Sequence, residues 1–290
     1  MIFRGEKREI GKRKEIKVSE KEREILEKLE KEGIKERIGP LRIKGELVPQ
    51  TVTLTSGEKV VFKPRQEEFL LRYERASYLM SSFLFRDIFP ELPLVPPTVI
   101  REIGGQKGVF QLFIPEAEAL AEIDLKRAEK GLKEQLLAFL IFDYIINQKD
   151  RRGNLLITKK EPKRIFLIDN EEIYPFSPVS KLPPEIFNVE IPLSIKEDLR
   201  NFCNSKDRVE KTLAGLLKQK EIDFCFKRAE RILEVIEKYG RVPREKEEYL
   251  EDIREKEGRE KQTRLTDFLE NIRTKEGREK QTELSDFLKD

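Results

Sequence analysis

The sequence predicts an α+β protein with two lobes, a small strand-rich N-terminal lobe and a helical C-terminal lobe, followed by a flexible C-terminal tail. Alternating apolar residues, which are typical of strands, concentrate between residues 41 and 114. Helical apolar spacing dominates from residue 125 to residue 239, and charge dominates from residue 244 onward. Because strands and helices are segregated rather than alternating along the chain, the pattern favours α+β over α/β.

The N-terminal elements follow from their local patterns. Residues 1–37 are expected to form a charged arm and a helix, and residues 38–115 the strand-rich lobe. The helix spans 18–34, begins with a capping box of Ser19 and Glu22, and stops at Gly33. After it we expect strands within 41–64 around a Ser56-Gly57 turn, a helix over 66–86, and strands over 98–103 and 108–114.

The C-terminal lobe is expected over residues 116–243. A helix over 125–147 becomes almost continuously apolar towards its end, which indicates a buried central helix. Two short strands then flank "KKEPK", and helices over 194–204, 206–219 and 221–239 complete the lobe. Residues 244–290 are mostly charged, and we expect a flexible tail there.

Composition excludes several function classes. Of the 290 residues, 40% are charged, chiefly Lys, Glu and Arg, which is typical of hyperthermophile proteins. With no histidine in the chain, Ser-His and Cys-His nucleophile systems and most zinc enzymes are excluded. The two cysteines, Cys203 and Cys225, lie in apolar helical surroundings and are interpreted as core residues.

Charge and hydropathy bear on location and partners. The net charge of +3 argues against a simple basic nucleic-acid binder, and we interpret the basic run "KREIGKRKEIK" as a solvated arm rather than a nucleic-acid site. No apolar run approaches the ~18–20 residues that span a bilayer, and the first residues contain no apolar signal-peptide region. We therefore expect a cytoplasmic protein with no membrane partner.

Five residues suggest phosphoryl transfer from ATP. This chemistry needs a cation on the phosphates, oxygen ligands for Mg²⁺ and an acidic residue that orients the attacking hydroxyl, and none of these roles requires histidine. Lys63 ends the apolar strand "KVVFK", and Glu74 in the following helix is placed to hold it. Asp150 begins the loop after the buried helix, while Asn154 and Asp169 are candidate metal ligands.

At these residues the chain resembles the atypical branch of the protein-kinase-like fold, which joins phosphatidylinositol 3- and 4-kinases with HipA-type kinases. The resemblance covers roughly residues 40–240 and rests on "VVFKP", "YERASYLMSSFL", "LVPPTVI", "GVFQLFI", "KDRRGNLLI" and "FLIDN". It implies that Lys63 binds the ATP phosphates and Glu74 anchors Lys63. It also implies that Asp150 is the catalytic base, and that Asn154 and Asp169 bind Mg²⁺.

The loop departs from the family pattern in two ways. Arg152 stands where the family usually has His, and Asn154 follows Asp150 by four residues where five are usual. Either Gly153 tightens the loop, or the register is one residue off. No clear Gly-rich phosphate loop is present either; Gly45 and the Ser56-Gly57 turn are weak candidates.

The tail contains an internal repeat, because residues 253–271 align without gaps with residues 272–290. Each copy contains "KQTxLxDFL", which resembles the archaeal PIP box that docks on the PCNA sliding clamp. The resemblance implies clamp binding by Gln262, Leu265, Phe268 and Leu269, and by Gln281, Leu284, Phe287 and Leu288. A Leu, a Phe three residues on and a Leu four residues on share one face of a helical turn. An ordinary amphipathic helix packing on the domain is the alternative.

Together these features predict an atypical kinase with ATP and Mg²⁺ as cofactors. We expect it to act on a hydroxyl of an unknown protein substrate and to be recruited to PCNA in DNA replication or repair. A catalytically degenerate kinase-fold adaptor that binds PCNA is one alternative. A nucleic-acid, lipid or small-molecule acceptor is another, and so is AMP transfer from an inverted nucleotide.

Overall fold

The structure, a computed structural model, describes residues 18–38, 42–43, 46–65, 67–120, 124–149, 151, 153–173, 175 and 182–243. The chain divides into two units, Met1–Val242 and Pro243–Asp290, and the described residues lie in the first unit except for Pro243. The basic arm, Asp150, Arg152 and both tail repeats lie outside the described residues.

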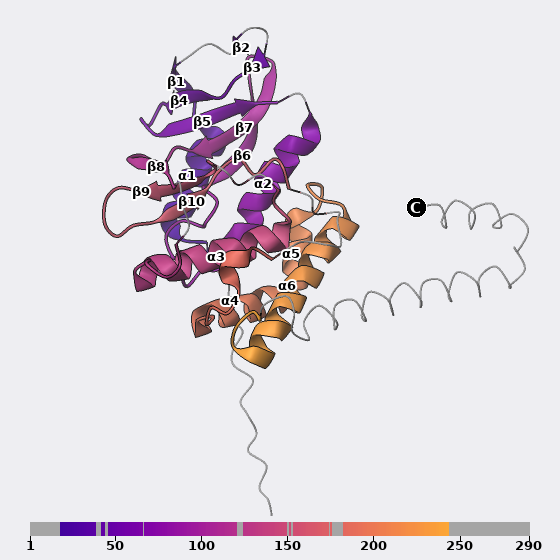
Figure 1. Ribbon diagram of the computed structural model, residues 1–290. Coiled ribbons are helices and arrows are strands. Elements are labelled where there is room, and N and C mark those ends of the chain that lie inside the picture. The colour runs from indigo at the N-terminus through magenta and orange to yellow at the C-terminus, as the bar shows by residue number, and fades with distance from the viewer. Residues whose placement is uncertain are drawn as a thin grey trace, which may run out of the picture. The chain divides into compact units, whose positions relative to one another are not determined.

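A five-stranded antiparallel sheet forms the N-terminal lobe (Figure 1). Its strands occur in the order β1-β4-β5-β7-β6. Their bounds are Ile34–Ile38 (β1), Gln50–Leu54 (β4), Lys59–Pro64 (β5), Thr98–Ile103 (β6) and Gln106–Leu112 (β7). Arg42–Ile43 (β2) and Glu46–Leu47 (β3) form a separate short pair. The predicted strands are present, and β1 is an additional edge strand.

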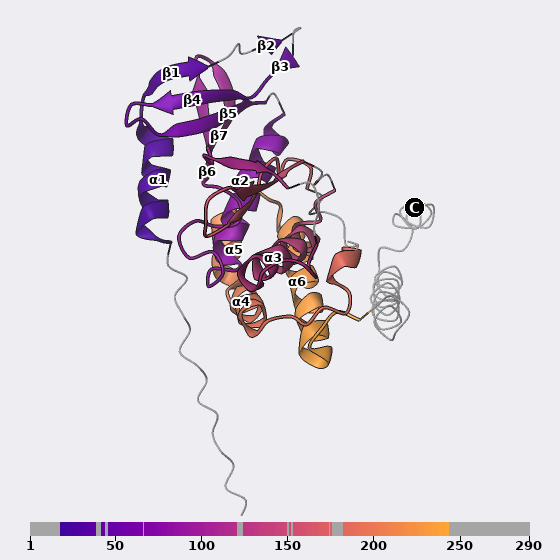
Figure 2. The ribbon, with the colours of Figure 1, turned by 60° about the vertical axis from the view of Figure 1, so that its left-hand side comes forward.

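Two helices pack against β6 and β7, namely α1 (Glu20–Lys31) and α2 (Glu68–Phe83), as Figure 2 shows. Ser19 caps α1 as predicted, because its hydroxyl accepts a hydrogen bond from the Glu22 N–H at 3.1 Å. The other half of the predicted capping box is absent. The Glu22 carboxylate turns into the interior and accepts a 2.7 Å hydrogen bond from the Tyr78 hydroxyl.

The C-terminal lobe is helical apart from one small sheet. Its helices are α3 (Lys130–Ile146), α4 (Leu193–Cys203), α5 (Lys206–Leu213) and α6 (Gln219–Tyr239), with a 3₁₀ turn at Pro184–Ile186. The sheet contains β8 (Ala117–Ala119), β9 (Leu155–Thr158) and β10 (Ile165–Leu167), in the order β10-β9-β8. The predicted hairpin around "KKEPK" is therefore confirmed and gains a third strand.

The core explains why α3 is so apolar. Every residue from Leu136 to Ile146 is buried, and α4, α5 and α6 pack with it in one hydrophobic cluster. The second half of α2 joins the same cluster, whereas α1 packs in a second cluster under the five-stranded sheet. The two-lobed α+β fold predicted from the sequence is thus confirmed.

Neither cysteine forms a disulfide. Cys203 and Cys225 are free thiols, and burial raises their pKa to about 12 and about 11 respectively. Both thiols are therefore neutral at ordinary pH and behave as core groups. None of the described helices is both long and apolar enough to cross a membrane.

Candidate active site

Lys63 lies near the end of β5, a strand paired on both sides by β4 and β7. Its side chain is only 8% exposed. Gly108 of β7, which pairs with Pro64, has to be small, because a Cβ there would lie 2.2 Å from the Phe62 ring and 2.7 Å from the Lys63 carbonyl oxygen. The close approach of the two strands therefore fixes the backbone that carries this lysine.

Glu74 on α2 holds the lysine, as the sequence predicted. The Lys63 ammonium donates a 2.6 Å hydrogen bond to Glu74 Oε1, and Glu74 is 1% exposed. Burial alone would lower the pKa of Lys63, but the attraction of Glu74 and of Asp169 outweighs it and raises the pKa above its ordinary value. Lys63 is therefore a fixed cation at neutral pH.

Asp169 approaches the same ammonium from the other lobe. It follows β10 closely, adopts a left-handed backbone with φ of 56°, and places Oδ1 3.5 Å from Lys63 Nζ. Its carbonyl oxygen accepts a hydrogen bond from Gln148 Nε2. The side chain is 40% exposed, so one of the three convergent charges faces solvent.

The loop that carries Asn154 is tightened at Gly153, whose φ is 75°. The Asn154 N–H donates to the Arg151 carbonyl at 3.1 Å, and the Asn154 carbonyl accepts from the Ile168 N–H at 3.0 Å. Asn154 therefore lies beside the residue that precedes Asp169, in spite of the shortened spacing. Asp150, the predicted base, lies outside the described residues.

Sequence reasoning missed the residue that holds this loop, Arg151. Its guanidinium makes a two-point ion pair with Asp143 of α3, with N–O distances of 2.8 and 2.7 Å. It also donates to the carbonyl oxygens of Asn154 and Ile168 and, at 2.9 Å, to Asn170 Oδ1. The available signal was Asp143 itself, a carboxylate in the apolar second half of α3 that requires a partner.

A second missed pair joins Arg65 to Glu171, with N–O distances of 2.6 and 2.9 Å. Glu171 also belongs to a group of three carboxylates with Glu74 and Asp169, whose oxygens lie within 4.8 Å of one another. Glu74 Oε2 is buried and has no hydrogen-bond partner. Oxygen ligands and a buried unpartnered carboxylate oxygen are what a hard divalent cation such as Mg²⁺ needs, so these residues fit a metal.

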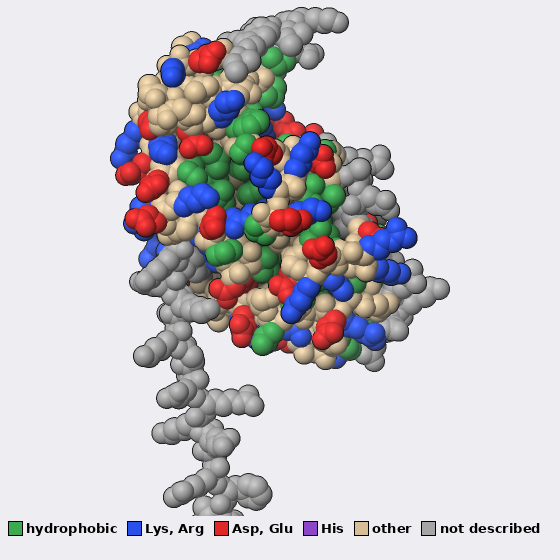
Figure 3. All heavy atoms as spheres, turned by 90° about the vertical axis from the view of Figure 1, so that its left-hand side faces the viewer, with side chains coloured by type: hydrophobic (Ala, Val, Ile, Leu, Met, Phe, Trp, Pro, Cys, Tyr) green, Lys and Arg blue, Asp and Glu red, His purple; other side chains and the backbone are tan. Residues whose placement is uncertain are grey.

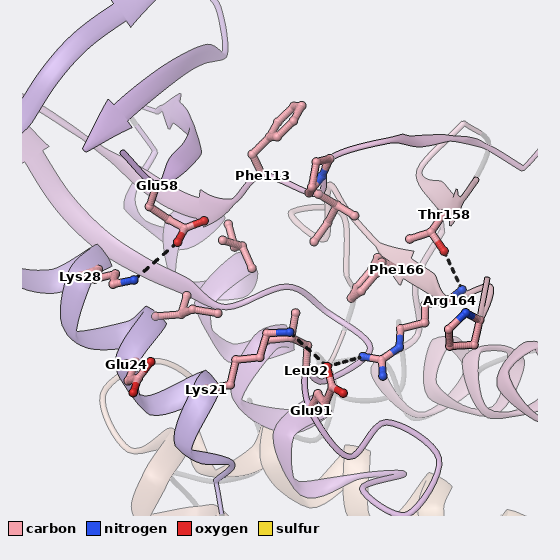
Figure 4. A pocket seen from close by; sticks show the side chains of 15 residues that line it. Lys21, Glu24, Lys28, Glu58, Glu91, Leu92, Phe113, Thr158, Arg164 and Phe166 are labelled. Carbon is pink, nitrogen blue, oxygen red and sulfur yellow. Dashed lines mark hydrogen bonds and ion pairs between the residues drawn. The ribbon is translucent and has the colours of Figure 1, made fainter. Parts of the chain in front are cut away.

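A separate hollow of about 650 Å³ lies between α1, the end of β7 and the β9–β10 hairpin (Figure 4). Hydrophobic side chains gather in a depression on this face of the molecule (Figure 3). Lys21 and Arg164 on its rim both pair with Glu91, at 3.1 and 3.3 Å. Lys63, Glu74 and Asp169 do not line it. The lysine–carboxylate cluster, and not this hollow, is therefore the candidate active site.

Comparison with solved structures gives the fold. The structure of the Golgi casein kinase matches with a TM-score of 0.50 and 13% identity over 74% of each chain. A hydra Fam20 structure with sugar matches with a TM-score of 0.52 and 14% identity, over 74% of this chain and 87% of that one. The chain has a protein-kinase-like fold. No protein-family model and no curated protein matches the sequence.

The comparisons establish the kinase-like fold but not the branch of kinase-like proteins to which the chain is related. Identities of 13% and 14% establish shared architecture alone, so the phosphatidylinositol-kinase and HipA-like assignment stays a prediction. The roles predicted for Lys63, Glu74, Asn154 and Asp169 likewise stay predictions.

Proposed function

We propose that the protein is an ATP-dependent phosphotransferase that acts on a protein hydroxyl. The observation that carries this proposal is the position of Lys63, whose ammonium lies between Glu74 of one lobe and Asp169 of the other, at 2.6 and 3.5 Å. Phosphoryl transfer depends on positioning and electrostatic stabilisation, and a fixed cation beside metal-ligating carboxylates supplies both.

Each residue has a role in this proposal. Lys63 binds phosphate oxygens, and Glu74 keeps it in place. Asp169 and Asn154 hold Mg²⁺, which when bound neutralises charge on the phosphates. Asp150 orients the acceptor hydroxyl and takes its proton.

Two labelled nucleotides test the reaction. The full-length protein is incubated with Mg²⁺ and either γ-labelled or α-labelled ATP, alone and with a lysate of cells that make it. We expect the γ-label alone to appear on protein, and Asp169→Ala to abolish it. Transfer of the α-label would instead indicate AMP transfer, and label on lipid, nucleic acid or a small molecule would change the acceptor class. Nucleotide binding without any transfer would favour the adaptor.

We further propose that the tail recruits the enzyme to the PCNA sliding clamp during replication or repair. The support is the repeated "KQTxLxDFL", in which Gln262 and Gln281 each precede an isolated apolar triplet. A short amphipathic turn of this kind suits a hydrophobic groove, and two copies on one chain raise apparent affinity by rebinding.

Calorimetric titration of the full chain into an archaeal PCNA tests this recruitment. We expect the double variant Phe268→Ala, Phe287→Ala to lose all binding heat. The matched control, Glu260→Gln with Glu279→Gln, changes one charge in each repeat just before the motif and should bind as the unchanged chain does. Equal binding by the double Phe variant would contradict the proposal.

A further inference from the structure

Two cation–carboxylate contacts link the end of β5 and the residue that follows it to the segment after β10. Lys63 faces Asp169, and two residues further along each segment Arg65 faces Glu171. The second contact is the closer one, because both guanidinium nitrogens involved lie within 2.9 Å of a Glu171 oxygen. The outer pair therefore has the same order of charges as the inner pair, but it makes a shorter, two-point contact.

The backbone holds Arg65 in this position. Its N–H donates to the Lys107 carbonyl at 3.3 Å, and its guanidinium also donates to the Pro64 carbonyl at 3.0 Å. The side chains of Arg65 and Glu171 are 19% and 18% exposed, so solvent and solutes reach both. The contacts with Lys107 and Pro64 thus fix Arg65, while the partial exposure of both side chains lets a solute compete for either one.

The charges around the pair do not balance. Glu74, Asp169 and Glu171 bring three carboxylates, whereas Lys63 and Arg65 bring two cations. The buried Glu74 Oε2, which has no hydrogen-bond partner, belongs to the same group. A divalent cation would relieve the excess negative charge, and it would compete with Arg65 for the Glu171 carboxylate.

A guanidinium fork binds phosphate as well as it binds carboxylate, through the same two parallel N–H donors. Glu171 therefore occupies in the free protein the part of Arg65 that a phosphate would use. We propose that Arg65 is a second phosphate-binding cation beside Lys63. In the free protein Glu171 pairs with the Arg65 guanidinium; when Mg-nucleotide binds, a phosphate replaces Glu171 on Arg65, and Mg²⁺ replaces Arg65 on Glu171. This inference rests on the proposed function, since it concerns the same nucleotide site.

A phosphate-binding role for Arg65 would also compensate for the lack of a Gly-rich phosphate loop. The sequence shows no clear Gly-rich loop to cover the phosphates, and Arg65, two residues after Lys63, supplies a charge in its place. A simple strut between the lobes is the competing explanation. A strut would need only opposite charges at positions 65 and 171, in either order.

Titration calorimetry of the full-length protein with ADP, with and without Mg²⁺, and with adenosine distinguishes the two explanations. We expect Arg65→Gln to weaken ADP binding roughly tenfold or more and to leave adenosine binding unchanged. Glu171→Gln should tighten Mg-free ADP binding several-fold, because Arg65 no longer has a competitor, and should reduce the gain that Mg²⁺ gives. Tighter binding cannot result from a loss of folding.

A matched pair controls for the removal of one charge. Arg200 and Glu237 form an exposed ion pair at 2.5 Å between α4 and α6, and Arg200→Gln and Glu237→Gln should leave ADP binding unchanged. The exchanged variant Arg65→Glu, Glu171→Arg should bind ADP no better than Arg65→Gln. Its recovery to the affinity of the unchanged chain would establish a strut and overturn the proposal.

Failure of the inference differs from failure of the proposed function. If the unchanged protein binds ADP while Arg65→Gln binds it equally well, Arg65 has no phosphate role and the kinase proposal stands. If the unchanged protein binds no ADP with or without Mg²⁺, both proposals fall.

Discussion

Arg151 and Asp143 form a two-point ion pair under the loop that carries Asn154, with N–O distances of 2.7 and 2.8 Å. The same guanidinium reaches the carbonyl oxygen of Ile168, next to Asp169. One arginine thus fixes α3, the loop and the segment that leads into Asp169 relative to one another. The arrangement of the candidate site therefore depends on this arginine as well as on Lys63, Glu74 and Asp169.

Replacement of Arg151 by Lys should therefore separate position from charge. Lys keeps the positive charge but cannot form the two-point pair and the carbonyl contacts together. We expect phosphate transfer to fall at least tenfold while the protein stays folded, as measured by γ-label transfer and circular dichroism. The conservative change Arg200→Lys in the exposed pair with Glu237 is the control and should have no effect. Full activity of Arg151→Lys would contradict the positioning role.

Glu74→Gln tests the buried pair with Lys63. The amide cannot neutralise the ammonium, so a nearly buried cation loses its main partner, which typically destabilises by about 3–5 kcal/mol. Chemical unfolding should show this loss, with the remaining Asp169 contact placing the effect toward the lower figure. Glu68→Gln, on the same helix and paired with Lys107 at an exposed site, should barely change the stability. Equal stability of the two variants would rule out a structural role for the pair.

Glu22→Gln tests whether α1 positions α2. The buried Glu22 carboxylate lies 3.0 Å from Arg86 Nη1 and accepts from Tyr78, which stands one turn after Glu74. The amide keeps a hydrogen bond to Tyr78 but leaves Arg86 without this carboxylate. We expect a melting temperature lower by several degrees and weaker ADP binding, because the helix that carries Glu74 loses a support. A lower melting temperature with unchanged ADP affinity would restrict Glu22 to a stabilising role.

A pH dependence follows from Tyr73, which links α2 to α6 by donating a 3.0 Å hydrogen bond to Glu221. Burial, together with the carboxylate, raises the pKa of Tyr73 to about 12. Because the folded-state pKa is the higher one, its contribution is complete below the unfolded value of about 10 and is lost as the pH rises towards 12. Urea unfolding should show a steeper loss of stability over that window in the unchanged protein than in Tyr73→Phe. Parallel curves would contradict the link.

Local patterns in the sequence predicted most of the fold. Apolar spacing located the helices and the paired strands, and Lys63 and Glu74 could be matched because they lie on a strand and on the helix that follows it. Strand β1 was missed because its sequence "IKERI" is mostly charged and directly follows a helix, and such an edge strand is recognised only through its pairing with β4. The predicted capping box was half wrong, since tertiary contacts with Tyr78 and Arg86 draw the Glu22 carboxylate away.

Site residues that stand at the end of a strand or on the next helix could be predicted from the sequence. Pairs between residues distant in the chain could not. The "FLIDN" strand end predicted Asp169 as a candidate metal ligand, and its carboxylate lies close to those of Glu74 and Glu171. Arg65 and Glu171 lie 106 residues apart in the chain, and only the tertiary structure brings the end of β5 close to the segment after β10. Asn154 follows Asp150 one residue earlier than is usual in the family. The turn at Gly153 nevertheless brings the Asn154 backbone into hydrogen-bond contact with Ile168, next to Asp169.

The most direct test of the Mg-nucleotide site is the Mg²⁺ dependence of ADP binding, measured by calorimetry in the unchanged protein and in Asp169→Asn. The variant keeps the size of the side chain and removes the charge that Mg²⁺ requires. We expect Mg²⁺ to tighten ADP binding to the unchanged protein at least tenfold and to have no such effect on Asp169→Asn. Equal enhancement in both proteins, or none in the unchanged one, would contradict a metal site at Asp169.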